Sequence, residues 1–207
     1  MELLIQFSIG FVIALSGALI PGPLLVAVIR STLKNGKKTG FFTSMGHITV
    51  EICIIFGVIL GISTFILSES IQSYIGTVGG LLLIIFGIIT FQESKKITQF
   101  QIEESGAISG GITTGVTFTL FNPTFPFWWA TIGFAMLSNA YYTSSFLGTI
   151  FWILGHFFAD ILWFSSVSIM ISQNKSIIGK KPHKYLIIAC AISMIIIGIL
   201  FLGKYLF

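Results

Sequence analysis

The chain contains the segment Gly46-His47-Ile48-Thr49-Val50-Glu51 and, 109 residues later, the segment Gly155-His156-Phe157-Phe158-Ala159-Asp160. Both read Gly-His-x-x-x-acid, and each lies inside a long apolar run. On a helix, positions i and i+4 share a face, so each segment places an imidazole beside a carboxylate. A charged side chain costs about 2.5–3.5 kcal/mol at the centre of a membrane helix. Two such pairs in apolar surroundings therefore indicate a functional centre.

Composition predicts a membrane protein. Apolar residues make up 55% of the 207 residues and charged residues 9%, whereas a soluble domain carries about 25% charged residues. The expected partner is therefore the lipid bilayer. The net charge of +4 is concentrated in a few loops, which indicates membrane topology and argues against nucleic-acid binding. The sequence has no phosphate-binding loop, Ser/His/Asp set or CxxC pair, so we expect neither an enzyme nor a cofactor.

Hydropathy predicts an all-α integral membrane protein with six transmembrane helices. The predicted spans cover residues 5–29, 42–67, 74–92, 107–137, 145–172 and 184–206. Ten of the eleven Lys and Arg residues lie in three alternate loops, at 30–38, 95–96 and 175–184. The positive-inside rule puts these loops in the cytoplasm and both termini outside. We therefore expect a multi-pass protein of the plasma membrane.

The two matched segments fall in the second and fifth predicted spans. A repeat of three spans is odd in number, so the second copy must enter the membrane from the opposite side. This arrangement is an inverted 3+3 repeat, a recurrent plan of secondary transporters. The predicted units are residues 1–92, a cytoplasmic connector at 93–106, and residues 107–207. Several Gly-x-x-x-Gly spacings permit close helix packing, including a homodimer.

Prolines interrupt the first span of each half. The first span contains Pro21-Gly22-Pro23, and the fourth contains Asn122-Pro123 followed by Pro126. Proline removes a backbone donor and clashes with the preceding turn, so helices 1 and 4 should be broken. Irregular backbone at membrane depth is tolerated where it is covered by protein or lines a water-filled cavity. These motifs predict either a substrate-lining site or structural kinks, and Asn122 is predicted either to cap the broken helix or to contact substrate.

The depth of the acids can be derived from the helical rise. At 1.5 Å per residue, Glu51 and Asp160 lie about 20 Å and 22 Å from the basic loops that flank their spans. The two acids therefore approach the midplane from opposite sides of a core about 30 Å thick. Three interpretations remain open: the pairs handle protons or a cationic substrate group, hold a divalent metal, or join neighbouring helices.

At these residues the chain resembles the LysE-type amino-acid exporter family. The resemblance rests on Pro21-Gly22-Pro23, on the Asn-Pro at 122–123, and on the acid at Glu51, and it covers nearly the whole chain. Thr124 follows the Asn-Pro where family members often have lysine, and the His-x-x-x-acid pairs indicate a divergent subgroup. The resemblance implies a six-span inverted-repeat carrier that exports amino acids or similar metabolites, driven by the proton gradient.

These observations predict a secondary transporter that exports small metabolites by alternating access. Protons and the substrate would bind at a site formed by Glu51, Asp160, His47, His156, Pro21, Gly22, Pro23, Asn122 and Pro123. The alternative is a divalent-cation exporter with His47, Glu51, His156 and Asp160 as ligands. No resident metal is expected in the first case.

Overall fold

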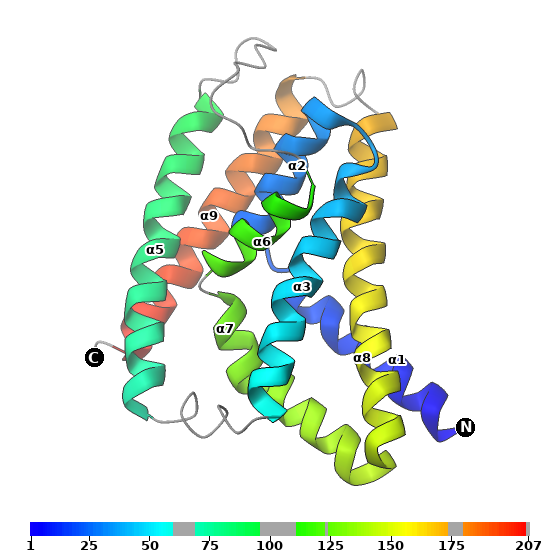
Figure 1. Cartoon of the computed structure of the whole chain (residues 1–207). Helices are drawn as coiled ribbons and strands as arrows, with labels where there is room; N and C mark the ends of the chain where they lie inside the picture. Colours follow the sequence, from blue (N-terminus) through cyan, green and yellow to red (C-terminus); the bar gives the residue numbers. More distant parts are fainter. Residues whose placement is uncertain (60–68, 96–110, 123, 174–179, 206–207) are drawn as a thin grey trace.

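The protein, seen in a computed structural model, is helical throughout the residues that the structure describes (Figure 1). These residues are 1–59, 69–95, 111–122, 124–173 and 180–205. The elements, in chain order, are α1 (Glu2–Ala18), α2 (Pro23–Asn35), α3 (Thr39–Ile59), α5 (Glu69–Lys95), α6 (Ile112–Leu120), α7 (Thr124–Trp128), the π-helical turn η1 (Trp129–Gly133), α8 (Phe134–Gln173) and α9 (Lys180–Tyr205).

Several of these helices are long and apolar enough to cross a membrane. Three qualify singly within the described chain, over Thr39–Gly57, Phe134–Gln173 and Ile187–Tyr205. Helices α1 and α2 qualify together, as a broken span or a re-entrant loop, and a shorter apolar helix covers Gly76–Gln92. The prediction of an all-helical membrane protein is confirmed at this level, with three to four candidate spans. The six-span count stays a prediction.

Both predicted helix breaks are present. Helix α1 ends at Ala18 and α2 begins at Pro23, and the two helices are bent by 83°. Pro23 occupies the first turn of α2, where its missing N–H costs nothing. Helix α6 ends at Leu120 and α7 begins at Thr124. Pro123, which was predicted to break this helix, lies outside the described residues.

Helix α8 is longer than any predicted span. Its 40 residues include a kink at Ser144 and Ser145, where the backbone leaves helical geometry. Ser145 has φ 58° and ψ −165°, a combination adopted almost only by glycine. The kink joins the end of the fourth predicted span to the fifth. Helix α5 also continues to Lys95, and residues 96–106 of the predicted connector lie outside the described residues.

Glycines set two helix crossings that have the same pattern of contacts. A Cβ on Gly46 of α3 would overlap the carbonyl oxygen of Ile112 in α6, and a Cβ on Gly115 of α6 would overlap that of Thr43 in α3. At the crossing of α1 and α8, Gly155 meets Phe7 and Gly10 meets Trp152 in the same way. The α3 and α8 members of these contacts are separated by 109 residues, and the α1 and α6 members by 105. The crossing of α3 with α6 therefore repeats that of α8 with α1.

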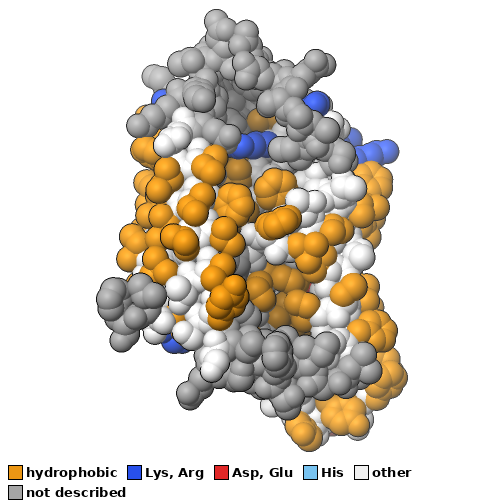
Figure 2. Space-filling model, turned by 60° about the vertical axis from the view of Figure 1, so that its left-hand side comes forward, with side chains coloured by type: hydrophobic (Ala, Val, Ile, Leu, Met, Phe, Trp, Pro, Cys, Tyr) orange, Lys and Arg blue, Asp and Glu red, His pale blue; other side chains and the backbone are white. Residues whose placement is uncertain are grey.

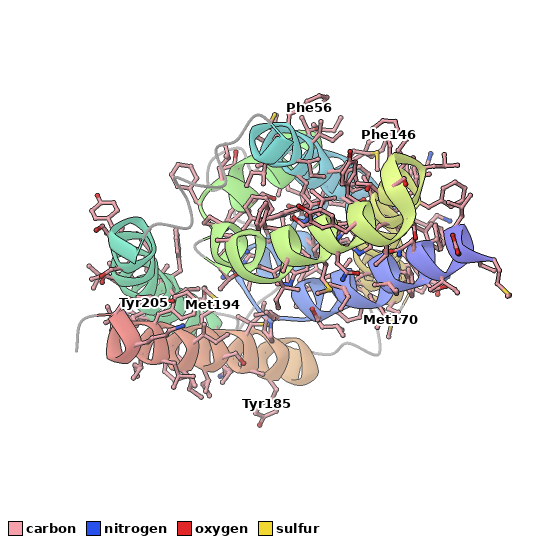
Figure 3. The ribbon with its side chains drawn as sticks, turned by 90° about the horizontal axis from the view of Figure 1, so that it is seen from below. Phe56, Phe146, Met170, Tyr185, Met194 and Tyr205 are labelled. Carbon is pink, nitrogen blue, oxygen red and sulfur yellow. The ribbon has the colours of Figure 1, made fainter. Side chains whose placement is uncertain are left out.

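Helices α5 and α9 pack along each other, also through glycine, with Gly80 and Gly198 each against the other's carbonyl oxygen. Figure 3 shows this pair side by side at one edge of the molecule, with Phe56, Phe146, Met170 and Tyr185 on the outside of the helices. In Figure 2, hydrophobic side chains cover much of the described surface, whereas Lys and Arg side chains gather mainly near its upper end. This distribution suits a protein surrounded by lipid tails.

Candidate functional site

The two His-acid pairs meet in one buried cluster between α3 and α8. His156 Nε2 lies 2.9 Å from Glu51 Oε1 and 3.5 Å from Asp160 Oδ2. His47 Nε2 lies 3.5 Å from Glu51 Oε1 and 4.0 Å from Asp160 Oδ1. Glu51 and Asp160 are each 2% exposed. The structure therefore brings together all four titratable residues that the sequence singles out.

The closest contact in the cluster joins the two halves of the chain. Residues four apart on one helix lie 3.5 Å from each other here, whereas His156 of α8 reaches Glu51 of α3 at 2.9 Å, within hydrogen-bond distance. The sequence predicts pairs within each helix. The observed partnership also crosses between helices, because α3 and α8 present their polar faces to each other. Neither half holds the complete cluster alone.

Two hydrogen bonds from the second half hold the His47–Glu51 pair. His47 Nδ1 lies 2.8 Å from Thr119 Oγ1 of α6, and Trp129 of η1 donates its indole N–H to Glu51 Oε1 at 3.3 Å. Three other buried polar atoms of the cluster have no hydrogen-bond partner among the described residues: Glu51 Oε2, His156 Nδ1 and Asp160 Oδ2. Buried polar groups are normally paired, so these three atoms are candidates for binding a ligand.

Aromatic rings surround the histidines. His156 stacks on Trp152 at 5.4 Å between ring centroids, and Trp128 and Trp129 lie within 5.2 Å and 5.4 Å of it. His47 contacts the edges of Phe125 and Phe164. Such rings exclude water and present π faces that attract cations.

A cavity of about 60 Å³ adjoins the cluster and reaches both helix breaks. By volume it has room for about four water molecules. All four cluster residues line it. The other lining residues include Ala14, Gly17, Ala18, Ile20, Gly22, Leu24, Leu25, Asn122, Thr124, Phe125, Trp128, Trp129 and Phe164.

The residues predicted at the breaks take different positions. Gly22 and Asn122 line the cavity, whereas Pro23 is buried at the start of α2 and neither it nor Pro21 is among the lining residues. Asn122 Oδ1 accepts hydrogen bonds from the backbone N–H and the hydroxyl of Thr124, at 3.2 Å and 2.8 Å. Asn122 thus caps α7 and also borders the cavity, and its contact with substrate stays a prediction.

Thr119 and Trp129 were not singled out as partners of the cluster. Trp129, like Trp128, follows Pro126 in the chain. Both tryptophans line the cavity. Thr119 offers no sequence signal, because its role arises only from the crossing of α6 with α3.

The same cluster has the chemistry of a metal site. His47, Glu51 and Asp160 offer one ligand atom each within 4.8 Å of one another. Nitrogen and carboxylate ligands suit divalent transition metals such as zinc or manganese. The geometry therefore accommodates either a metal ion or a hydrogen-bonding cation.

A broken-helix cavity with buried titratable groups, inside an apolar helical protein, is typical of secondary transporters. The family model described as "LysE type translocator" matches residues 15–204. The chain belongs to the LysE-type translocator family. The resemblance stated from the sequence is thereby confirmed, and so is its place among membrane transport proteins. No curated protein and no solved structure matches the chain. For this translocator, membership favours transport of a small molecule over membrane enzymology.

Proposed function

We propose that the protein is a secondary transporter that exports amino acids or related small metabolites, with protons as the coupling ion. The observation that carries the proposal is the gathering of Glu51, Asp160, His47 and His156 at a cavity between two broken helices. A translocator needs groups that bind a charged or polar cargo without water, and these four titratable side chains line the cavity. Carboxylates and imidazoles can also carry protons.

The proposed architecture is a six-span inverted repeat in the plasma membrane, with both termini outside. The repeated glycine crossings support it, since α3 meets α6 by the same contacts through which α8 meets α1. The start of α1 and the end of α9 lie in the lower half of Figure 1, whereas the basic turn between α2 and α3 lies at its upper end. Alternating access then consists of rocking one pair of crossed helices against the other around the cluster. A homodimer stays a prediction.

Transport by inside-out membrane vesicles tests this function. Vesicles that contain the protein receive each of the labelled amino acids under an imposed proton gradient. We expect at least one to accumulate, and its accumulation to collapse when the gradient is dissipated. Glu51→Gln and Asp160→Asn should each reduce this uptake at least tenfold. Glu2→Gln, at the exposed start of α1, is the matched control and should transport normally. Unchanged uptake in both cluster variants would remove the site from the proposal.

Divalent-cation export is a second candidate, and one specific observation favours it. The sequence offered each His-acid pair no third ligand nearby, whereas the packing of α3 on α8 brings His47, Glu51 and Asp160 within 4.8 Å. The same vesicles, given zinc or manganese in place of amino acids, distinguish the two cargoes. Accumulation of metal without accumulation of any amino acid would select this candidate.

A further inference from the structure

The repeated glycine crossings define which residues of the two halves correspond. Gly46 corresponds to Gly155 with a separation of 109 residues, and Gly10 corresponds to Gly115 with a separation of 105. By the same separations His47 corresponds to His156, and Thr119 corresponds to Ala14. This correspondence rests on the inverted repeat proposed above.

The corresponding positions Thr119 and Ala14 differ in chemistry. Thr119 supplies a hydroxyl to Nδ1 of His47 at 2.8 Å. Ala14, its counterpart, has no polar side-chain atom, and Nδ1 of His156 has no hydrogen-bond partner among the described residues. His156 is 3% exposed, and both it and Ala14 line the cavity. The repeat is therefore broken at the position where a partner for the second histidine belongs.

The tautomer of His156 indicates what kind of group is missing. Glu51 Oε1, which lies 2.9 Å from Nε2, can only accept a hydrogen bond when the carboxylate is ionised, so Nε2 carries the proton. In a neutral imidazole Nδ1 is then an acceptor. When both carboxyls are ionised, Glu51 Oε2 and Asp160 Oδ2 are acceptors too, and neither atom has a hydrogen-bond partner among the described residues. A ligand that fits this side of the cluster must donate hydrogen bonds.

We propose that the substrate's ammonium group binds on the α1 side of the cluster, between Ala14 and the His156–Asp160 pair. A primary ammonium has three N–H donors, and the acceptors of His156 and Asp160 receive two of them. Trp128 and Trp152, which both lie against His156, add π faces that attract a cation. The His47–Glu51 pair is already held by Thr119 and Trp129, and it orients the cluster. Ala14 leaves room for the ligand, and Thr119 is a positioning residue.

Binding of methylammonium, the smallest primary ammonium with a carbon substituent, tests this assignment without any transport step. Three of the four tryptophans contact His156, so their fluorescence should report binding to the purified full-length protein in lipid nanodiscs. We expect saturable binding of methylammonium and none of acetate. Binding is measured directly, so this result can be interpreted even if the vesicle experiment finds no transported amino acid.

Ala14→Ser adds a hydroxyl that can donate to Nδ1 of His156, as Thr119 serves His47. We expect it to weaken methylammonium binding about tenfold. Ala189→Ser, which adds the same hydroxyl at an exposed position of α9, is the matched control and should bind within about threefold of the native protein. Thr119→Val, which removes the hydroxyl that bonds to His47, should lower the melting temperature.

Three results with these proteins would overturn the proposal. They are equal loss of affinity in Ala14→Ser and Ala189→Ser, saturable binding of acetate, or binding of zinc with none of methylammonium. Asp160→Asn gives a second test that does not depend on how Ala14→Ser folds. It replaces an acceptor oxygen of the proposed site by an amide donor, and we expect it to abolish methylammonium binding. Retained binding in Asp160→Asn would also refute the assignment.

Discussion

Alanine at Gly46 should separate two helices that touch through their backbones. The added Cβ would overlap the carbonyl group of Ile112 and come within 2.9 Å of the backbone nitrogen of Val116. Backbone atoms cannot rotate aside as a flexible side chain can, so α3 and α6 must move apart. Overpacking of this kind costs about 1–3 kcal/mol, and a clash with backbone belongs at the upper end. We therefore expect a cost of about 3 kcal/mol.

The matched control is Gly203→Ala, where an added Cβ meets nothing within 4 Å. Replacing glycine by alanine in a helix stabilises by up to about 1 kcal/mol, and both variants gain from this term. Comparing the variants therefore leaves mainly the overpacking cost. For a chain of this length 1 kcal/mol shifts the melting temperature by about 2–4 °C, so the two variants should differ by about 6–12 °C.

Thermal unfolding of the purified proteins in detergent, followed by tryptophan fluorescence, measures this difference. Gly155→Ala should behave like Gly46→Ala, because its Cβ would overlap the carbonyl oxygen of Phe7 at the corresponding crossing. Melting temperatures of Gly46→Ala and Gly203→Ala within 2 °C of each other would refute the backbone contact. A large effect at Gly46 with none at Gly155 would refute the equivalence of the two crossings.

Two further predictions concern the kink in α8. Ser145→Gly should raise the melting temperature, because it relieves about 1–3 kcal/mol of backbone strain at φ 58°. Ser144→Gly, at φ −137°, is the control and should bring no such relief. Equal shifts in melting temperature for the two variants would contradict strain at Ser145. Gln6→Leu should destabilise the protein by about 1–3 kcal/mol, because the buried Gln6 side chain donates part-buried hydrogen bonds to Thr143 and Ser144 at 2.9 Å and 3.1 Å. An unchanged denaturation midpoint in a chemical unfolding experiment would count against that role.

Local chemistry explains which parts of the fold the sequence predicts. The breaks near Pro21 and Asn122 follow from what proline does to its own turn, and the shared face of His47 and Glu51 follows from the helical period. Neither inference needs a second helix. The predicted depth of Glu51 and Asp160 also suits their meeting in one cluster.

Features that depend on contacts between helices were not predicted, because local sequence patterns do not specify those contacts. No local pattern marks Thr119 in α6, and it lies beside His47 because α6 crosses α3 at Gly115. Trp129, which donates to Glu51, is the first residue of the π-helical turn, and no residue type predicts that turn. The backbone at Ser145 likewise takes a conformation that a serine would not suggest. Tertiary packing, rather than local preference, selects all three.

The shortest contact of the cluster leads to a last prediction, about how the two halves depend on each other. Four titratable side chains near the midplane would cost about 10–14 kcal/mol if each were isolated. Contacts within α3 or α8 offset little of this free-energy cost, because the intrahelical His–acid distances of 3.5 Å are long for hydrogen bonds. The hydrogen bond from His156 to Glu51, at 2.9 Å, forms only when the two halves assemble. The cluster should therefore couple the halves energetically.

Double-mutant cycles measure this coupling, with Glu51→Gln combined in turn with His156→Phe and His47→Phe. Contacting polar residues have coupling energies of about 0.5–3 kcal/mol, so we expect the Glu51–His156 cycle to lie in the upper part of this range. The Glu51–His47 cycle should lie in the lower part, because that pair is 3.5 Å apart and His47 also bonds to Thr119. Chemical denaturation in detergent gives both values. A larger coupling for the intrahelical pair would mean that each half stabilises its own charges, and the meeting of α3 and α8 would then contribute little to the stability of the cluster.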